Sequence, residues 1–223
     1  MNIVDNLHEV KRNLPLNITL VAVSKKQSIS SVKEVYDAGQ RDFGENYIQD
    51  MLEKHKTLPK DIRWHMIGKV QRNKLKYIAP FVHLIHGIEK LDQLETLDKE
   101  AAKHQRVIRC LLQVKISQEE SKFGMTAGEA DEILTSEVYT CMDHVKIIGL
   151  MGMATFTEDE RRLRSEFEFL HTIFNWLKEK DASFETLSMG MSADHQTAVD
   201  CGSTMVRVGR AIFGVRDYRV HSV

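Results

Sequence analysis

The sequence predicts an α/β protein built as a single (β/α)8 barrel, or TIM barrel, with an extra helix at its amino terminus. Eight short apolar runs, many of them rich in β-branched residues, alternate with segments of helical periodicity. The connections between them are short, which calls for parallel strands joined by right-handed crossovers. At 223 residues and 42% hydrophobic content, the chain can bury such a core. A doubly wound open sheet is the alternative.

The first element is a helix at residues 2–13, which Pro15 closes. The first strand, residues 18–25, is a continuous apolar run that ends in a lysine. The other predicted strands lie at residues 41–46, 62–68, 82–88, 107–114, 145–153, 186–192 and 205–213. The predicted helices that follow the strands run from the Ser28 or Ser30 cap to Gly39, from 47 until Pro59, and over 71–79, 90–104, 127–137, 158–179 and 194–201. Since no linker or shift of composition interrupts this alternation, we expect one domain over residues 1–223.

Composition narrows the class of protein. With 31 basic and 32 acidic residues the formal charge is −1, so neither nucleic acid nor membrane is expected as a partner. The three cysteines, Cys110, Cys141 and Cys201, lie far apart, which suits a reducing cytoplasm and argues against disulfides. No signal peptide is expected, and no HExxH or nucleotide-binding loop occurs. We therefore expect a cytoplasmic monomer without a metal site.

Polar residues follow several of the predicted strands. The carboxyl ends of barrel strands form one rim, where the chemistry of such barrels lies. The expected rim residues are Lys25, Glu45, Asn46, His65, Gly68, Ser192 and the turn at 207–210. Burial at the end of an apolar strand would lower the pKa of Lys25, and a neutral amine can form a Schiff base with a carbonyl. His65 is interpreted either as a hydrogen-bonded histidine packed under Trp64 or as a catalytic base.

The last two units favour a phosphate site. Barrels often bind phosphate with the loops after strands seven and eight. Ser192 supplies a hydroxyl there, and Gly209 allows backbone amides to approach an anion. The alternative is that these are ordinary turns in which Ser192 caps its own helix. Arg207 has two interpretations as well: an ion pair with Asp200 or Glu45, or a hydrogen bond to an unprotonated ring nitrogen of a cofactor.

Several motifs, in this order along the chain, resemble the YggS/PROSC family of pyridoxal phosphate homeostasis proteins over residues 18–218. They are Val-Ala-Val-Ser-Lys at 21–25, Phe-Gly-Glu-Asn-Tyr at 43–47, Trp-His-Met-Ile-Gly at 64–68, Ser-Lys-Phe-Gly at 121–124, Gly-Leu-Met at 149–151, Leu-Ser-Met-Gly-Met-Ser at 187–192 and Gly-Ser-Thr-Met-Val-Arg-Val-Gly at 202–209. The resemblance implies a barrel like the N-terminal domain of alanine racemase.

The resemblance also implies a cofactor site. Lys25, not Lys26, would carry pyridoxal 5′-phosphate as a covalent aldimine, with Asn46 beside the cofactor. Ser192 and the Gly209–Arg210 turn would hold the phosphate, and Arg207 would face the pyridine nitrogen. Arg210 departs from the family pattern, where a small hydroxyl residue is expected. The turn at 154–156 also departs from a more usual proline-containing one.

The function implied is a non-catalytic carrier or buffer of pyridoxal 5′-phosphate in vitamin B6 and amino-acid homeostasis, in transient contact with apo-enzymes that use this cofactor. An amino-acid racemase is the alternative. Alanine racemases take a catalytic tyrosine from an added β-domain of the partner subunit, and this chain ends at Val223 directly after the eighth unit. We therefore expect the carrier. A cofactor-free barrel that uses Lys25 as an aldolase-type Schiff-base lysine is disfavoured by the phosphate turns.

Overall fold

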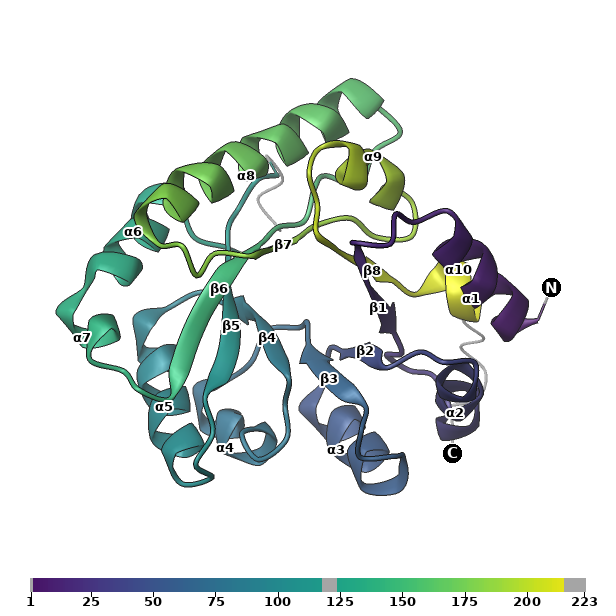
Figure 1. Ribbon diagram of the computed structural model, residues 1–223, viewed down its shortest axis with the longest axis horizontal. Coiled ribbons are helices and arrows are strands. Elements are labelled where there is room, and N and C mark those ends of the chain that lie inside the picture. The colour runs from purple at the N-terminus through teal and green to yellow at the C-terminus, as the bar shows by residue number, and fades with distance from the viewer. Residues whose placement is uncertain (1, 118–123, 215–223) are drawn as a thin grey trace.

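Eight parallel strands close into a barrel in the order β1 to β8 (Figure 1). The structure is a computed structural model and describes residues 2–117 and 124–214. β1 pairs with β2 on one side and with β8 on the other, so the sheet has no free edge. The strands are β1 Thr19–Val23, β2 Asp42–Glu45, β3 Arg63–Met66, β4 Leu84–Ile88, β5 Ile108–Gln113, β6 Val145–Met151, β7 Thr186–Ser188 and β8 Met205–Val208. The predicted barrel is confirmed, and the open sheet is wrong.

Helices surround this barrel (Figure 1). They are α1 Ile3–Arg12, α2 Ile29–Asp37, α3 Ile48–Thr57, the 3₁₀ turn η1 Arg72–Lys74, α4 Leu75–Ile78, α5 Leu91–Ala102, α6 Ala127–Thr135, α7 Glu137–Thr140, α8 Glu160–Lys180, α9 His195–Asp200 and α10 Arg210–Phe213. The extra amino-terminal helix is α1, which packs against α2 and α10. It begins at the Asn2 side chain, which accepts the amide of Asp5.

Two apolar layers hold the barrel, because successive side chains of a strand point to opposite faces. The larger layer lies between strands and helices, where Phe43, Trp64 and Phe167 are fully buried. A smaller cluster comes from five strands, which only the barrel interior can bring together. Its members are Val21, Leu84, Leu111, Ile148, Met151 and Met205. The interior also carries polar side chains at both of its ends, and these form the sites described below.

Three predicted segments differ from the structure. Residues 71–79 form the turn η1 followed by the short helix α4. Residues 127–137 divide at Ser136, whose extended backbone ends α6 and whose hydroxyl accepts the amide of Tyr139 to begin α7. Residues 205–213 were expected to form a strand, but the strand ends at Val208 and α10 follows. The motif residues 121–123 lie outside the described residues.

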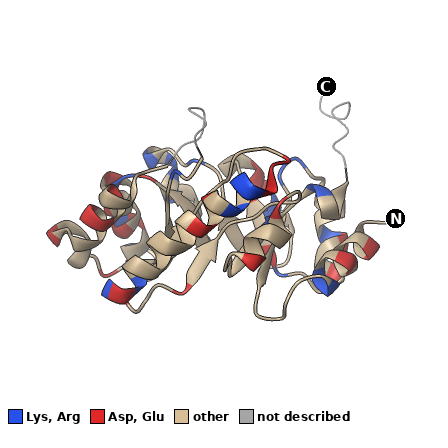
Figure 2. Ribbon diagram, turned by 90° about the horizontal axis from the view of Figure 1, so that it is seen from above, with Lys and Arg blue, Asp and Glu red and all other residues tan. Residues whose placement is uncertain are grey.

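Within the described ranges, we find no helix that is both long enough and apolar enough to cross a membrane. Acidic and basic residues are interspersed over the helices in Figure 2, and that view shows no broad face of a single sign. This distribution agrees with the near-zero formal charge.

Candidate functional site

Lys25 lies just beyond the end of β1, at the carboxyl-terminal rim of the barrel. Its side chain is half-buried, and it follows the fully buried Ser24. Lys26 is exposed and adopts a left-handed backbone conformation with φ of 59°. Of the two adjacent lysines, Lys25 is therefore the more shielded from water, which is the environment that a reactive amine requires.

A buried ion pair supports the backbone of Ser24, the residue before Lys25. Lys54 of α3 donates from Nζ to Glu45 Oε1 at 2.6 Å and to the carbonyl oxygen of Ser24 at 2.7 Å. The Ser24 hydroxyl donates to the same carboxylate oxygen at 2.6 Å. Burial raises the pKa of Glu45, although Lys54 and Ser24 act in the opposite direction. Ser24 is thus fixed from both its side chain and its backbone.

Asn46 follows β2 at the same rim and has an orphaned polar atom. Its Oδ1 is buried, and no hydrogen-bond partner for it is found among the described residues. Leaving such an oxygen unpaired costs about 1–3 kcal/mol. A Cβ at Gly68, which follows β3, would lie 2.4 Å from the carbonyl oxygen of Asn46, so this close approach requires glycine. The position suits a ligand that donates a hydrogen bond to Asn46.

Ser192 connects the turns after β7 and β8. Its hydroxyl accepts the backbone N–H groups of Gly209 at 3.1 Å and of Ala211 at 3.4 Å. Asp194, not Ser192, occupies the N-cap of α9, so the interpretation of Ser192 as the cap of its own helix is wrong. Arg210 is exposed and begins α10. The two turns therefore place a hydroxyl and converging amides together.

Gly209 brings this hydroxyl and its amides close to the lysine strand. A Cβ added at Gly209 would lie 3.1 Å from the carbonyl oxygen of Val23 and 3.2 Å from its Cβ. The turn after β8 thus packs directly against the end of β1. Because Lys25 follows Val23 closely, the predicted phosphate position and the predicted reactive amine lie at neighbouring points of the rim.

Arg207 is buried on β8 and is bound by neutral oxygens. Its Nη1 donates to the backbone oxygen of Ser188 at 2.8 Å and to the Ser188 hydroxyl at 2.6 Å, and its Nη2 donates to the carbonyl of Gly152 at 3.0 Å. Burial lowers its pKa to about 10, so the guanidinium keeps its proton at neutral pH.

The ion pair predicted for Arg207 with Asp200 or Glu45 is wrong. Asp200 is exposed beyond the barrel wall, 3.8 Å from Arg164, and Glu45 is paired with Lys54.

A continuous row of hydrogen bonds leads from Arg207 through the barrel interior. We call it the polar chain, and its members are Arg207, Ser188, His86, His65 and Asp42. After the Arg207–Ser188 bond, Ser188 Oγ lies 3.1 Å from His86 Nδ1, His86 Nε2 lies 3.0 Å from His65 Nδ1, and His65 Nε2 lies 3.0 Å from Asp42 Oδ1. The side chains of the polar chain are almost entirely shielded from solvent.

His65 is therefore not a residue of the carboxyl-terminal rim, and that prediction is wrong. It also does not pack under Trp64, since successive residues of a strand face opposite ways. Trp64 faces the helices and packs against Phe43 with ring centroids 6.1 Å apart, whereas His65 faces the barrel interior.

Which atoms of the polar chain donate hydrogen bonds depends on the charge of Asp42 and on the protonation of the two histidines. Burial alone would raise the pKa of Asp42, but hydrogen bonds from Arg63 and His65 hold it well below its usual range, so this carboxylate only accepts. His65 Nε2 must then be a donor. Burial holds the pKa of His86 well below its usual value, and the charge of Arg207 acts in the same direction, so His86 is neutral. When both rings are neutral, His86 Nε2 donates to His65, and the Ser188 hydroxyl donates to His86.

The sequence did not point to Lys54, His86, Ser188 or His83. Lys54 is one of several charged residues on an amphipathic helix, and such residues are usually exposed. The other three lie within or beside apolar strands. A polar residue at an inward-facing position of an otherwise apolar strand is the signal that could have found them.

Comparison with known proteins places the chain among relatives of similar size. The family model "Alanine racemase, N-terminal domain" matches residues 1–217. A pyridoxal phosphate homeostasis protein of Pasteurella multocida is 34% identical, covering 98% of this chain and 99% of that protein. The protein of the same name from Escherichia coli is 36% identical, covering 92% and 88%.

Solved structures also superpose on most of this chain. The structure of PipY from Synechococcus elongatus with PLP bound superposes with a TM-score of 0.86 at 31% identity, covering 96% of this chain and all of that one. An alanine racemase of Clostridium difficile superposes with a TM-score of 0.82 at 13% identity, covering 98% of this chain and 58% of that one, which shows the shared fold alone.

Proposed function

The chain belongs to the pyridoxal phosphate homeostasis protein family, and we propose that it carries or buffers pyridoxal 5′-phosphate by reversible attachment to Lys25, without catalytic turnover. The observation that carries this proposal is the arrangement of the carboxyl-terminal rim. A shielded lysine, an orphaned amide oxygen and a hydroxyl with converging amides follow β1, β2 and the last two strands.

The rim residues fit the parts of the cofactor. Lys25 would bind the aldehyde carbon of the cofactor. The side-chain oxygen of Asn46 would accept a hydrogen bond from the cofactor. Ser192 and the amides at Gly209 and Arg210 would hold the phosphate, and the charge of Arg210 would add attraction in place of a hydroxyl contact.

Arg207 would face the pyridine nitrogen from the barrel interior. Once bound, the cofactor supplies an electrophilic aldehyde and a ring that can accept electrons. Arg207 remains protonated and can only donate, so it would leave the ring nitrogen without a proton. The ring is then a poorer acceptor of electrons, which favours storage over turnover.

Amino-acid racemisation is the alternative function. It shares the fold, but the sequence identity to the alanine racemases is 13–16%. The two relatives named for cofactor homeostasis that are described above are 34% and 36% identical over most of their length. The carrier is therefore the better supported proposal.

Further expectations accompany it. We propose a monomer of one domain over residues 1–223 that works in the cytoplasm, where the free thiols of Cys110, Cys141 and Cys201 would stay reduced. Its protein partners would be apo-enzymes that receive the cofactor in transient encounters.

The test of attachment compares two neighbouring lysines. Protein loaded with pyridoxal 5′-phosphate is reduced with borohydride, and the labelled peptide is identified by mass spectrometry. We expect the label on Lys25, its loss with the visible absorbance in Lys25→Ala, and an unchanged result in the control Lys26→Ala. Label and colour that persist in Lys25→Ala but vanish in Lys26→Ala would reject the assignment.

The test of function mixes loaded protein with an apo-enzyme. Recovery of that enzyme's activity at a rate set by transfer supports the carrier. Racemisation of alanine or another common amino acid at a rate typical of enzymes, roughly 1 s⁻¹ or faster, would support the racemase instead.

A further inference from the structure

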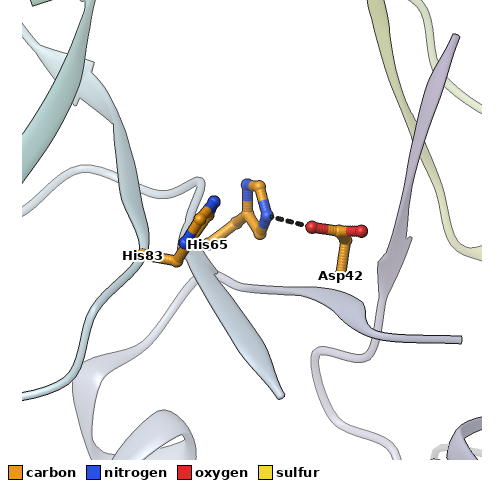
Figure 3. A group of neighbouring side chains, drawn as sticks. All are labelled: Asp42, His65 and His83. Atoms are coloured by element: carbon orange, nitrogen blue, oxygen red, sulfur yellow. Dashed lines mark hydrogen bonds and ion pairs between the residues drawn. The ribbon is translucent and has the colours of Figure 1, made fainter. Parts of the chain in front are cut away.

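The barrel has a second concave site, at the end opposite Lys25. A cavity of about 660 Å³ opens there and is lined by residues at the starts of the strands, among them Thr19, Asp42 and Arg63. Asp42, His65 and His83 come from or just before three neighbouring strands and meet at the wall of this cavity (Figure 3). No role for these residues follows from the proposed cofactor site.

Their geometry is close to that of a metal site. Each residue offers one ligand atom, and these atoms lie within 4.8 Å of one another. His65 Nε2 and Asp42 Oδ1 are 3.0 Å apart, as the dashed line in Figure 3 marks. Ligand atoms of a tetrahedral site with bonds near 2.1 Å are about 3.4 Å apart. Two ligands are thus already close to this spacing, and a small movement of His83 completes the set.

The surroundings hold the first two ligands in place. His65 Nδ1 is bound to His86 Nε2, which is the kind of contact that orients metal-binding histidines. Asp42 receives both Nε and Nη2 of Arg63. By contrast, in the part of the chain that the structure describes, no hydrogen bond to the ring of His83 is found, and its side chain is half-buried beside the cavity.

We propose that Asp42, His65 and His83 bind a divalent transition-metal ion of the zinc type, with its remaining coordination position open to the cavity. Two imidazoles and one carboxylate suit zinc, cobalt, nickel or copper better than magnesium or calcium, which prefer oxygen ligands alone. The neighbouring Arg63 reduces the charge that Asp42 presents, so the affinity is below that of a structural zinc site.

The charges at this mouth are mixed, because Lys11, Arg41, Arg63 and Arg109 line the cavity together with Asp42 and Glu185. The three arginines that line the cavity are each occupied by a carboxylate: Arg63 by Asp42, Arg41 by Asp61 at 2.9 Å and Arg109 by Glu185 at 3.6 Å. The arginines can bind an anion only by leaving these carboxylates. A metal ion has to replace the hydrogen bond between His65 and Asp42 and to recruit His83. It also has to share Asp42 with Arg63, whose Nε donates to the same Oδ1 at 2.7 Å.

Starting from two neutral imidazole rings, binding conserves the number of protons. The metal takes the lone pair of His65 Nε2, and the proton of that neutral ring then resides on Nδ1, where it points to His86. His86 moves its own proton from Nε2 to Nδ1, and the Ser188 hydroxyl turns away from His86. Each imidazole keeps one proton, so a change of tautomer accompanies metal binding.

The test is calorimetric titration of the tag-free full chain with zinc, after treatment with a chelator, together with the visible spectrum of the cobalt(II) form. We expect one ion per chain and a tetrahedral or five-coordinate cobalt spectrum. His83→Ala and His83→Gln should lower the affinity by more than about ten-fold. His104→Ala is the matched control, because His104 is exposed and distant in sequence from the cluster, and it should bind like the parent.

Circular dichroism and urea unfolding of each variant show whether it remains folded. Equal zinc affinity in the parent and in two folded His83 variants would overturn the proposal, as would the lack of binding at millimolar zinc.

Discussion

Replacing Lys54 by methionine tests how strongly the buried ion pair supports the lysine-bearing rim. The side chain of Glu45 is fully buried and that of Lys54 is 6% exposed. Lys54→Met removes the cation but leaves the carboxylate, whose Oε2 already has no partner among the described residues. Breaking a buried pair in this way costs about 3–5 kcal/mol of unfolding free energy. For a chain of this size, that lowers Tm by on the order of 10 °C.

The matched control is Lys33→Met. Lys33 Nζ lies 2.6 Å from Asp37, the same distance as in the Lys54–Glu45 pair, but the Lys33 and Asp37 side chains are 48% and 56% exposed. Water already solvates such a pair, so we expect a loss of at most about 0.5 kcal/mol. Urea unfolding followed by circular dichroism gives both values. If the two substitutions reduce stability equally, burial does not govern the strength of the pair and the reasoning fails.

The same variant has a predicted pH dependence. Burial already raises the pKa of Glu45 above its ordinary value of 4.5, and without Lys54 it rises further. The folded state then binds more protons than the unfolded state, so stability falls as pH rises from about 4.5 through the raised pKa. The deficit of Lys54→Met relative to the parent should therefore be smaller near pH 5 than near pH 8. A deficit that grows on acidification would contradict the desolvation argument.

Three other substitutions test separate parts of the site. Asn46→Ala should weaken binding of pyridoxal 5′-phosphate about five- to ten-fold, measured by equilibrium titration, because one hydrogen bond of about 1 kcal/mol is lost. Gly190→Ala should lower the unfolding free energy by about 1–3 kcal/mol, measured in urea, because φ is +95° there and the new Cβ would lie 2.7 Å from that of Ala198. Ser188→Ala should cost about 1–3 kcal/mol by the same assay, since it leaves His86 Nδ1 without its hydrogen bond.

Much of the fold follows from local sequence. The apolar run predicted as a strand at 107–114 forms β5, Ile108–Gln113. The helix predicted at 158–179 forms α8, whose buried face includes Phe167, Leu170, Phe174 and Leu177. The first is a continuous apolar run, and the second is a long helix with a strongly periodic buried face. The segment at 205–213 was predicted as one strand because its apolar residues continue past Gly209 and Arg210, where they form the short helix α10.

The site, too, could be predicted only in part from the sequence. Lys25, Asn46 and Ser192 were expected at the rim because strand ends share one edge, and the structure places them after β1, β2 and β7. Their partners could not be predicted, because contacts depend on which face of each element turns inward. In the sequence, Lys54 is one charged residue of a predicted helix. Its contact with Glu45 is seen only when the helix and the end of β2 are placed together. Likewise, a shift of the strand register by one residue would turn His65 away from the barrel interior, to the face that Trp64 occupies.

The polar chain couples the two ends of the barrel if both proposals hold. A neutral imidazole has one donor and one acceptor, so the proton position on His65 dictates that on His86, and His86 dictates the orientation of the Ser188 hydroxyl. Arg207 donates to that same hydroxyl oxygen at 2.6 Å. A zinc ion at Asp42 would therefore reverse the chain and change the hydrogen-bonding environment of the guanidinium that faces the pyridine nitrogen. Nitrogen NMR of the imidazoles reports this reversal directly: the protonated and unprotonated signals of His65 and His86 should exchange positions when zinc is added. Unchanged tautomers in zinc-saturated protein would show that the two ends act independently.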